Sequence, residues 1–182
     1  MRLARIVSGG QTGVDRGALD AALAADFPCG GRCPAGRLAE DGRIPDRYPL
    51  AETAEDDYRV RTRRNVEDSD ATLILAPGSL SGGTLLTVEY CRRAGRPCLV
   101  VDADDHSPRE AVWVVAGWVG RHDVRVLNVA GPRASGWEGA EAYAAAVIGG
   151  LIDKTQSDSD RRAAENSARS VSGGEQVEPR QR

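Results

Sequence analysis

The chain has 182 residues, of which 41% are hydrophobic, 28% are charged and only 4% are aromatic. These proportions fit one folded domain with an aliphatic core, and they exclude collagen-like and wholly disordered chains. The 24 basic and 27 acidic residues give a net charge of −3. That balance argues against a nucleic-acid partner, because such a partner favours a basic excess.

The sequence contains no apolar run near the ~20 residues that span a membrane, so we expect no membrane partner. The apolar stretch near the first residue is too short for a secretory signal, and we expect a cytoplasmic protein. Cys29, Cys33, Cys91 and Cys98 lack the spacing of a zinc site. We expect them to be small buried hydrophobic residues, and we predict no metal site.

Short β-branched runs alternate with helical patterns along the chain. Strands are predicted at Leu3–Val7, Cys29–Cys33, Thr72–Ala76, Pro97–Val101 and Val124–Val129. Helices are predicted at Arg16–Ala25, Tyr58–Asp68, Leu85–Ala94, Pro108–Val119 and Glu138–Ile152. This alternation predicts an α/β fold, a Rossmann-like open parallel β-sheet flanked by helices on both faces. Ligands of such sheets bind at the carboxyl ends of the strands.

The composition changes after Ile152, where apolar residues nearly vanish. Without apolar surface to bury, nothing offsets the entropy of ordering the chain. We therefore predict a single folded domain over residues 1–152 and a disordered C-terminal tail over residues 153–182.

A glycine-rich loop, Ser8–Gly13, follows the first predicted strand, and Asp15 stands near the start of the next helix. Glycines allow a close approach to a ligand, and a helix N-terminus offers free N–H groups and partial positive charge. The loop lacks the Gly-Lys-Ser/Thr of a P-loop and the Gly-x-Gly-x-x-Gly of dinucleotide-binding proteins. The alternative is a tight turn with a favourable charge on Asp15 at the helix start. The residues predicted to bind a phosphate or another oxyanion are Ser8, Gly9, Gly10, Gln11, Thr12, Gly13 and Asp15.

A second glycine-rich loop, Gly78–Thr84, follows the central predicted strand. Its hydroxyls and paired glycine amides can surround an anion. Glu89 in the next helix is either a solvated surface residue or a carboxylate that contacts the ligand. The predicted binding residues here are Ser81, Gly82, Gly83, Thr84 and Glu89.

Two further segments carry candidate binding residues. In the turn after the last strand, Arg133 either reaches an anion or is an ordinary surface arginine. The long insertion Pro34–Asp57 has no predicted regular structure, as is common for a lid or a binding loop. Arg61 and Asn65 in the following helix are four residues apart and so share one face. The predicted binding residues in these segments are Arg37, Arg61, Asn65, Asn128, Gly131 and Arg133.

Motifs in all of these loops occur in the order found in the bacterial "putative molybdenum carrier" family, which the chain resembles over about residues 1–152. The motifs are Ser8–Asp15, Gly31–Arg37, Ala39–Gly42, Ile44–Pro45, Arg47–Leu50, Asn65–Val66, Asp68–Asp70, Ser81–Thr84, Thr87–Glu89 and Asn128–Arg133. That family is similar to LOG-type and DprA-type Rossmann-like proteins, which bind nucleotides or related phosphorylated ligands.

The resemblance implies a carrier of the molybdenum cofactor (molybdopterin), a pterin with a phosphate monoester, held as cargo and not converted. In that case no residue is catalytic, and the oxyanion lies on the amides of Gly9–Gly13 or of Gly82–Thr84. The segment Arg37–Leu50 would close over the ring as a lid. Related folds also imply a homodimer or homotetramer.

The alternative is a LOG-type phosphoribohydrolase, which cleaves the N-glycosidic bond of nucleoside monophosphates. Such enzymes carry the signature Gly-Gly-x-Gly-Thr-x-x-Glu, and the spacing from Gly82 to Glu89 is kept here. In the enzyme, Glu89 would support the ribosyl cation, and Arg61 or Arg133 would hold the phosphate. Leu85 and Leu86 replace the later Gly-Thr of the signature, which favours the carrier.

Overall fold

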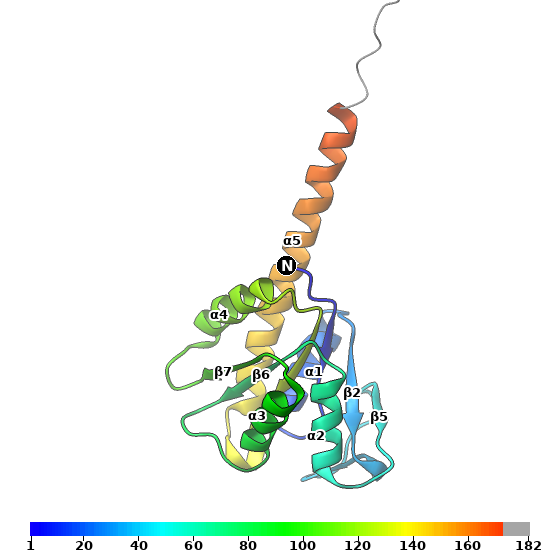
Figure 1. Ribbon diagram of the computed structural model, residues 1–182, viewed down its shortest axis with the longest axis vertical. Helices are drawn as coiled ribbons and strands as arrows, with labels where there is room; N and C mark the ends of the chain where they lie inside the picture. Colours follow the sequence, from blue (N-terminus) through cyan, green and yellow to red (C-terminus); the bar gives the residue numbers. More distant parts are fainter. Residues whose placement is uncertain (173–182) are drawn as a thin grey trace, which may run out of the picture.

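The computed structural model of the protein describes residues 1–172 and is built around a parallel sheet of six strands (Figure 1). The order of the strands across the sheet is β5-β2-β1-β8-β6-β7, and every pairing between them is parallel. Their bounds are β1 Arg5–Val7, β2 Cys29–Cys33, β5 Leu50–Glu52, β6 Ala71–Ala76, β7 Cys98–Asp102 and β8 Val126–Ala130. The predicted open parallel sheet is confirmed.

Helices cover both faces of this sheet, as the sequence predicts (Figure 1). One face carries α1 (Val14–Ala24), α4 (Pro108–Arg121) and α5 (Ala140–Ser172), which pack against one another. The other face carries α2 (Tyr58–Glu67) and α3 (Gly82–Ala94), which also contact each other. The class is therefore α/β and Rossmann-like.

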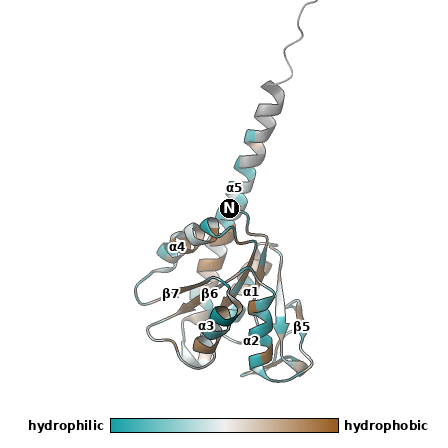
Figure 2. Cartoon of the chain, viewed as in Figure 1, coloured by the Kyte–Doolittle hydropathy of each residue, from teal (hydrophilic) through white to brown (hydrophobic). Residues whose placement is uncertain are grey.

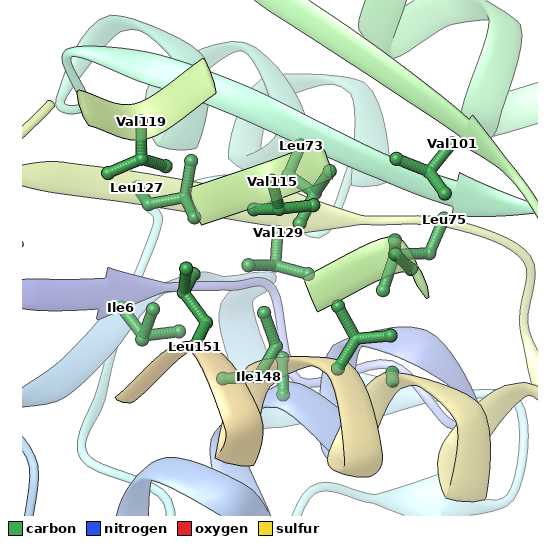
Figure 3. Packing of buried hydrophobic residues seen from close by; sticks show 14 of the residues in the cluster. Ile6, Leu73, Leu75, Val101, Val115, Val119, Leu127, Val129, Ile148 and Leu151 are labelled. Carbon is green, nitrogen blue, oxygen red and sulfur yellow. The ribbon is translucent and has the colours of Figure 1, made fainter. Parts of the chain in front are cut away.

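The main core lies between the sheet and the first of these helix layers. Successive side chains of a strand point to opposite faces, so Leu73 and Leu75 of β6 face the same layer. They meet Ile148 and Leu151 of α5 in a cluster of fully buried aliphatic residues, part of which Figure 3 shows. Burying each such side chain contributes about 1.5–3 kcal/mol, which makes this layer the main support of the fold.

The insertion between β2 and α2 is ordered, which corrects the expectation of a structureless lid. It holds a short 3-10 helix, η1 (Ala35–Arg37), an antiparallel hairpin of β3 (Leu38–Ala39) and β4 (Gly42–Arg43), and then β5. Ile44, Tyr48 and Leu50 from the insertion pack with Leu19 and Cys33 in a second small core. Because these apolar residues are irregularly spaced, no strand or helix period marked them in the sequence.

The last helix, α5, continues without a break from Ala140 to Ser172. Residues 153–172 of the predicted tail belong to this helix, whereas residues 173–182 lie outside the described part of the chain. Burial does end near the predicted boundary, since Ile152 and then Thr155 are buried while most of the described side chains that follow are exposed. Figure 2 shows the change from hydrophobic to largely hydrophilic colours along α5.

Two kinds of side-chain and terminal contact accompany the helical continuation. The hydroxyls of Thr155 and Ser159 bond to carbonyls one turn earlier, and the N-terminal amine of Met1 lies 3.2 Å from Asp158 Oδ2. No helix in the described part of the chain is long and apolar enough to cross a membrane.

Candidate functional site

A cleft of about 360 Å³ opens at the carboxyl edge of the sheet. Parallel α/β sheets bind ligands at this edge, and the volume falls in the range of small-molecule sites. Its walls come from the loop after β1, from α2, from the loop after β6 with the first turns of α3, and from the loop after β8.

Eight of the residues predicted from the sequence line this cleft. They are Gln11, Asp15, Arg61, Ser81, Gly83, Thr84, Gly131 and Arg133. The sequence analysis missed the contribution of α2 beyond Arg61, namely Tyr58, Arg59 and Thr62. Tyr58 stands three residues before Arg61 and could have been indicated by that spacing, and Thr62 in turn stands four residues after Tyr58. The wall formed by the β6–α3 connection and the first turns of α3 also includes Ser79, Leu80, Leu86 and Thr87.

A buried ion pair forms part of the cleft wall. Arg61 Nη1 of α2 lies 3.1 Å from Asp15 Oδ2 of α1, and the two side chains are only 14% and 4% exposed. The guanidinium lies so close over the β1–α1 loop that a Cβ on Gly9 would overlap it. The absence of a side chain at Gly9 thus allows the Arg61 side chain of the protein itself to approach the backbone closely. Burial raises the pKa of Asp15, and the positive charge of Arg61 opposes that rise.

Gln11 lies beside this ion pair and is 5% exposed. Its backbone N–H donates to Asp15 Oδ2 over 3.3 Å. Its side-chain Oε1 accepts from the backbone N–H groups of Thr12 at 3.0 Å and Glu40 at 2.9 Å. The side-chain Nε2 is buried, and so is Arg61 Nε, and neither has an acceptor among the described residues. Two buried donors are therefore left for an acceptor from outside the protein.

Two amides of the β1–α1 loop are used within the protein. The N–H groups of Gln11 and Thr12 donate to side chains of the same loop and of α1, and the N–H of Val14 donates to Pro132 O at 3.2 Å. Gly13 has a φ of +78°, and a Cβ there would lie 2.6 Å from Pro132 O. The loop is thus built for tight packing against the β8 loop.

At the start of α3, the N–H of Thr84 donates to Ser81 O at 3.2 Å, whereas the N–H groups of Gly82 and Gly83 have no acceptor among the described residues. Ser81 is the N-cap and makes no side-chain capping bond, while the backbone of Gly82 is left-handed at φ +52°. A Cβ on Gly83 would meet no atom within 4 Å, and Gly83 lines the cleft. The first N–H groups of a helix have no intrahelical acceptor and carry partial positive charge. This end of the cleft therefore suits an anion.

Arg133 lies at the rim and is held by the insertion. Its Nε stands 3.7 Å from Glu40 Oε2, and Glu40 also accepts hydrogen bonds from the hydroxyls of Thr12 and Ser135. These bonds, led by that of Ser135, lower the pKa of Glu40. Glu40 thus joins the β1 loop, the insertion and the β8 loop, and it orients Arg133.

Several other predicted site residues are used within the protein. Arg37 is buried and donates to the backbone carbonyls of Ile44, Pro45, Tyr48 and Leu50. Asn65 bonds both backbone groups of Arg32 in β2. No residue of the segment Arg37–Leu50 lines the described cleft, so that segment does not act as its lid in this structure.

Two more predicted residues tie neighbouring strands together. Asn128 Nδ2 donates to Thr72 Oγ1 at 3.2 Å, and Ser8 Oγ donates to Val129 O at 2.8 Å. Five more predicted residues belong to the backbone next to the cleft but do not line it. They are Gly9, Gly10, Thr12, Gly13 and Gly82.

Glu89 also lies outside the cleft lining. It is half-exposed on α3 and lies 3.4 Å from Arg93, one turn later on the same helix. The four cysteines are free thiols, and Cys33 belongs to the second core. Within residues 1–172 no group of three or more His, Cys, Asp or Glu side chains could hold a metal ion.

Comparisons with known proteins place this chain in a wider group. The family model described as cpYpsA, "Circularly permutated YpsA SLOG family", matches residues 6–152. A crystal structure from Syntrophus aciditrophicus SB, named "Putative molybdenum carrier protein", is 42% identical to the chain with a TM-score of 0.81. The match covers 83% of this chain and 96% of that chain. No curated protein matches the chain.

Proposed function

The chain belongs to the circularly permutated YpsA SLOG family, and from that premise we propose that it binds a phosphorylated heterocyclic ligand without converting it. The ligand is molybdopterin-like or nucleotide-like, and the molybdenum cofactor, carried as cargo, is the named candidate. The name of the similar Syntrophus protein, a molybdenum carrier protein, supports a molybdenum-related ligand.

The observation that carries the proposal is the uncapped start of α3 at the cleft. The amides of Gly82, Gly83 and Thr84 begin the helix there, and Arg59, Arg61 and Arg133 line the same cleft. A phosphate monoester matches both the helix dipole and the guanidinium groups. Between the two phosphate sites that the sequence left open, we favour α3, because the Arg61 guanidinium covers Gly9 and the N–H groups of Gln11 and Thr12 already have acceptors within the protein.

Apolar side chains in the same cleft suit a planar ring. Tyr58, Leu80 and Leu86 lie in its lining together with Pro77 and Pro132. Small-molecule sites commonly combine such apolar walls with a few polar groups that fix orientation. The proposed pose puts the phosphate at α3 and the ring toward Gln11 and Asp15.

The position of Glu89 supports a carrier over a phosphoribohydrolase. Glycosidic cleavage needs a carboxylate directed at the developing positive charge on the sugar. Glu89 is outside the cleft and beside Arg93, and the carboxylate inside the cleft, Asp15, is occupied by Arg61. A cytoplasmic location and a homodimer or homotetramer stay predictions from the sequence.

Native mass spectrometry of the freshly purified full chain tests the proposal. We expect a non-covalent adduct with the mass of a phosphorylated heterocycle, and Gly83→Val should lose it because the added side chain enters the cleft. Gly120→Val is the matched control, since Gly120 also lies in a helix with open space around a Cβ, in α4 away from the cleft. The proposal would be contradicted if the wild-type protein carried no adduct and if phosphorylated heterocycles did not raise its thermal stability.

A further inference from the structure

The side-chain amide of Gln11 has a defined orientation. Its Oε1 accepts two hydrogen bonds, from the backbone N–H groups of Thr12 and Glu40 at 3.0 and 2.9 Å. Rotating the amide by half a turn would point its NH2 group at two other N–H donors, which is unfavourable. Gln11 therefore offers a donor, and not an acceptor, on the side of Nε2.

Asp15 supplies a carboxylate from the same part of the cleft wall. The Asp15 carboxylate receives the backbone N–H of Gln11 at 3.3 Å, and both residues line the cleft. Gln11 Nε2 is buried with no acceptor in the described structure, and a buried donor without an acceptor costs about 1–3 kcal/mol. The lining of the cleft thus contains one unsatisfied N–H donor, which belongs to Gln11, and one carboxylate, which belongs to Asp15.

We propose that Gln11 and Asp15 select the heterocycle, and that they select one with a lactam edge, in which a keto oxygen stands beside a ring N–H. This inference rests on the proposed function and names the ligand class of the same cleft. Gln11 Nε2 donates to the keto oxygen, and Asp15 accepts from the ring N–H. A 6-aminopurine has the opposite pattern, because its amine donates and its ring nitrogen accepts. That edge would set amine against amide NH2 and ring nitrogen against carboxylate.

Arg61 is the member of this cluster that has to move when the ligand binds. Gln11 Nε2 is buried in the present conformation, so a ligand reaches it only after a side chain shifts. Arg61 is bonded to Asp15 through Nη1, and its Nε has no acceptor in the described structure. Turning the guanidinium from Asp15 toward the ligand's phosphate opens the edge and supplies the missing acceptor.

Binding of inosine and adenosine 5′-monophosphates to the full chain tests this inference by calorimetry. The two nucleotides carry the same ribose phosphate and differ only at the edge in question. We expect wild type to bind inosine monophosphate at least about tenfold more tightly, because sites built for hydrogen bonds reject mismatched analogues. Gln11→Glu keeps Oε1 and removes the donor, so the affinity ratio should fall to about one or below.

Gln156→Glu is the matched control, because it makes the same chemical change at an exposed position of α5 and should leave the ratio unchanged. If Gln11→Glu does not fold, Gln11→Met removes the donor without adding charge and should also bring the ratio toward one. Equal binding of both nucleotides by wild type, or a preference that survives the loss of the Gln11 donor, would overturn the inference. Binding of neither nucleotide, with no adduct on the purified protein, would instead overturn the proposed function.

Discussion

Asp15 of α1 and Arg61 of α2 meet at 3.1 Å in the wall of the cleft, although 46 residues separate them in the sequence. Their contact joins the helix layers of the two sheet faces at the carboxyl edge. It also explains Gly9, whose backbone lies directly beneath the guanidinium. While Arg61 stays on Asp15 the two charges largely cancel, so the positive charge of Arg61 becomes available to a phosphate only when the guanidinium turns away from Asp15.

Arg61→Gln should make the stability of the protein more dependent on pH. Burial holds the pKa of Asp15 above the ordinary value of an aspartate, and Arg61 limits that rise. A carboxyl whose folded pKa is raised favours the folded state at low pH and loses this contribution as pH rises through the folded pKa. Without Arg61 the pKa of Asp15 rises further, and the loss is larger.

Urea unfolding of both proteins from pH 4 to pH 8 measures this effect. We expect Arg61→Gln to cost little near pH 4 and about 3 kcal/mol at pH 7, the scale for an uncompensated buried charge. The double variant Asp15→Asn, Arg61→Gln should show much less of this dependence. A penalty of the same size at every pH would mean that Asp15 titrates independently of Arg61.

Much of the sheet could be predicted because its strands are apolar and bounded by glycine or helical patterns. Cys29–Cys33 was predicted with the bounds that β2 has, and β6 differs by one residue. The edge strand β5 has three residues, Leu50–Glu52, and pairs only with β2 among the described residues. Such a short segment carries no period of its own, so its tertiary pairing decides its conformation.

The candidate site was predictable in place but not in detail. The loops that the sequence singled out do lie at the carboxyl edge, because topology alone puts them there. Which side chains face the cleft depends on contacts distant in the sequence. Arg37 and Arg61 look equivalent in the sequence, yet four carbonyls of the insertion use the donors of the first. Only the folded chain distinguishes them.

Arg37→Lys therefore should reduce stability and not ligand affinity. A lysine cannot reproduce the planar set of donors that Arg37 directs at the insertion, and buried carbonyls left without donors cost about 1–3 kcal/mol each. We expect the free energy of unfolding to fall by about 2–4 kcal/mol. Calorimetric titration with inosine monophosphate at a temperature where the variant is folded should give the wild-type affinity. A selective loss of affinity would return Arg37 to the binding site.

Glu89→Gln separates the two functions that the sequence left open. The sequence predicts Glu89 as a binding residue, and a carrier that uses it to bind would lose affinity in this variant. The structure revises that expectation, because Glu89 lies outside the cleft next to Arg93. We expect an affinity within about twofold of wild type, as for a surface pair worth at most ~1 kcal/mol. Chromatography of nucleoside monophosphates after incubation is the companion assay. Release of free base by wild type that ceases in Glu89→Gln would establish the hydrolase instead.

The central claim is that the cleft holds a phosphorylated ligand by its phosphate at the start of α3. The most direct test is a titration of isotope-labelled protein, followed by NMR through its backbone amide resonances. With inosine monophosphate as ligand, the account predicts saturable shifts that are largest at Gly82, Gly83 and Thr84 and that extend to Gln11. Inorganic phosphate should move the α3 amides and leave Gln11 nearly unchanged. Saturable binding that shifts the hairpin Leu38–Arg43 and leaves the α3 amides in place would contradict the account.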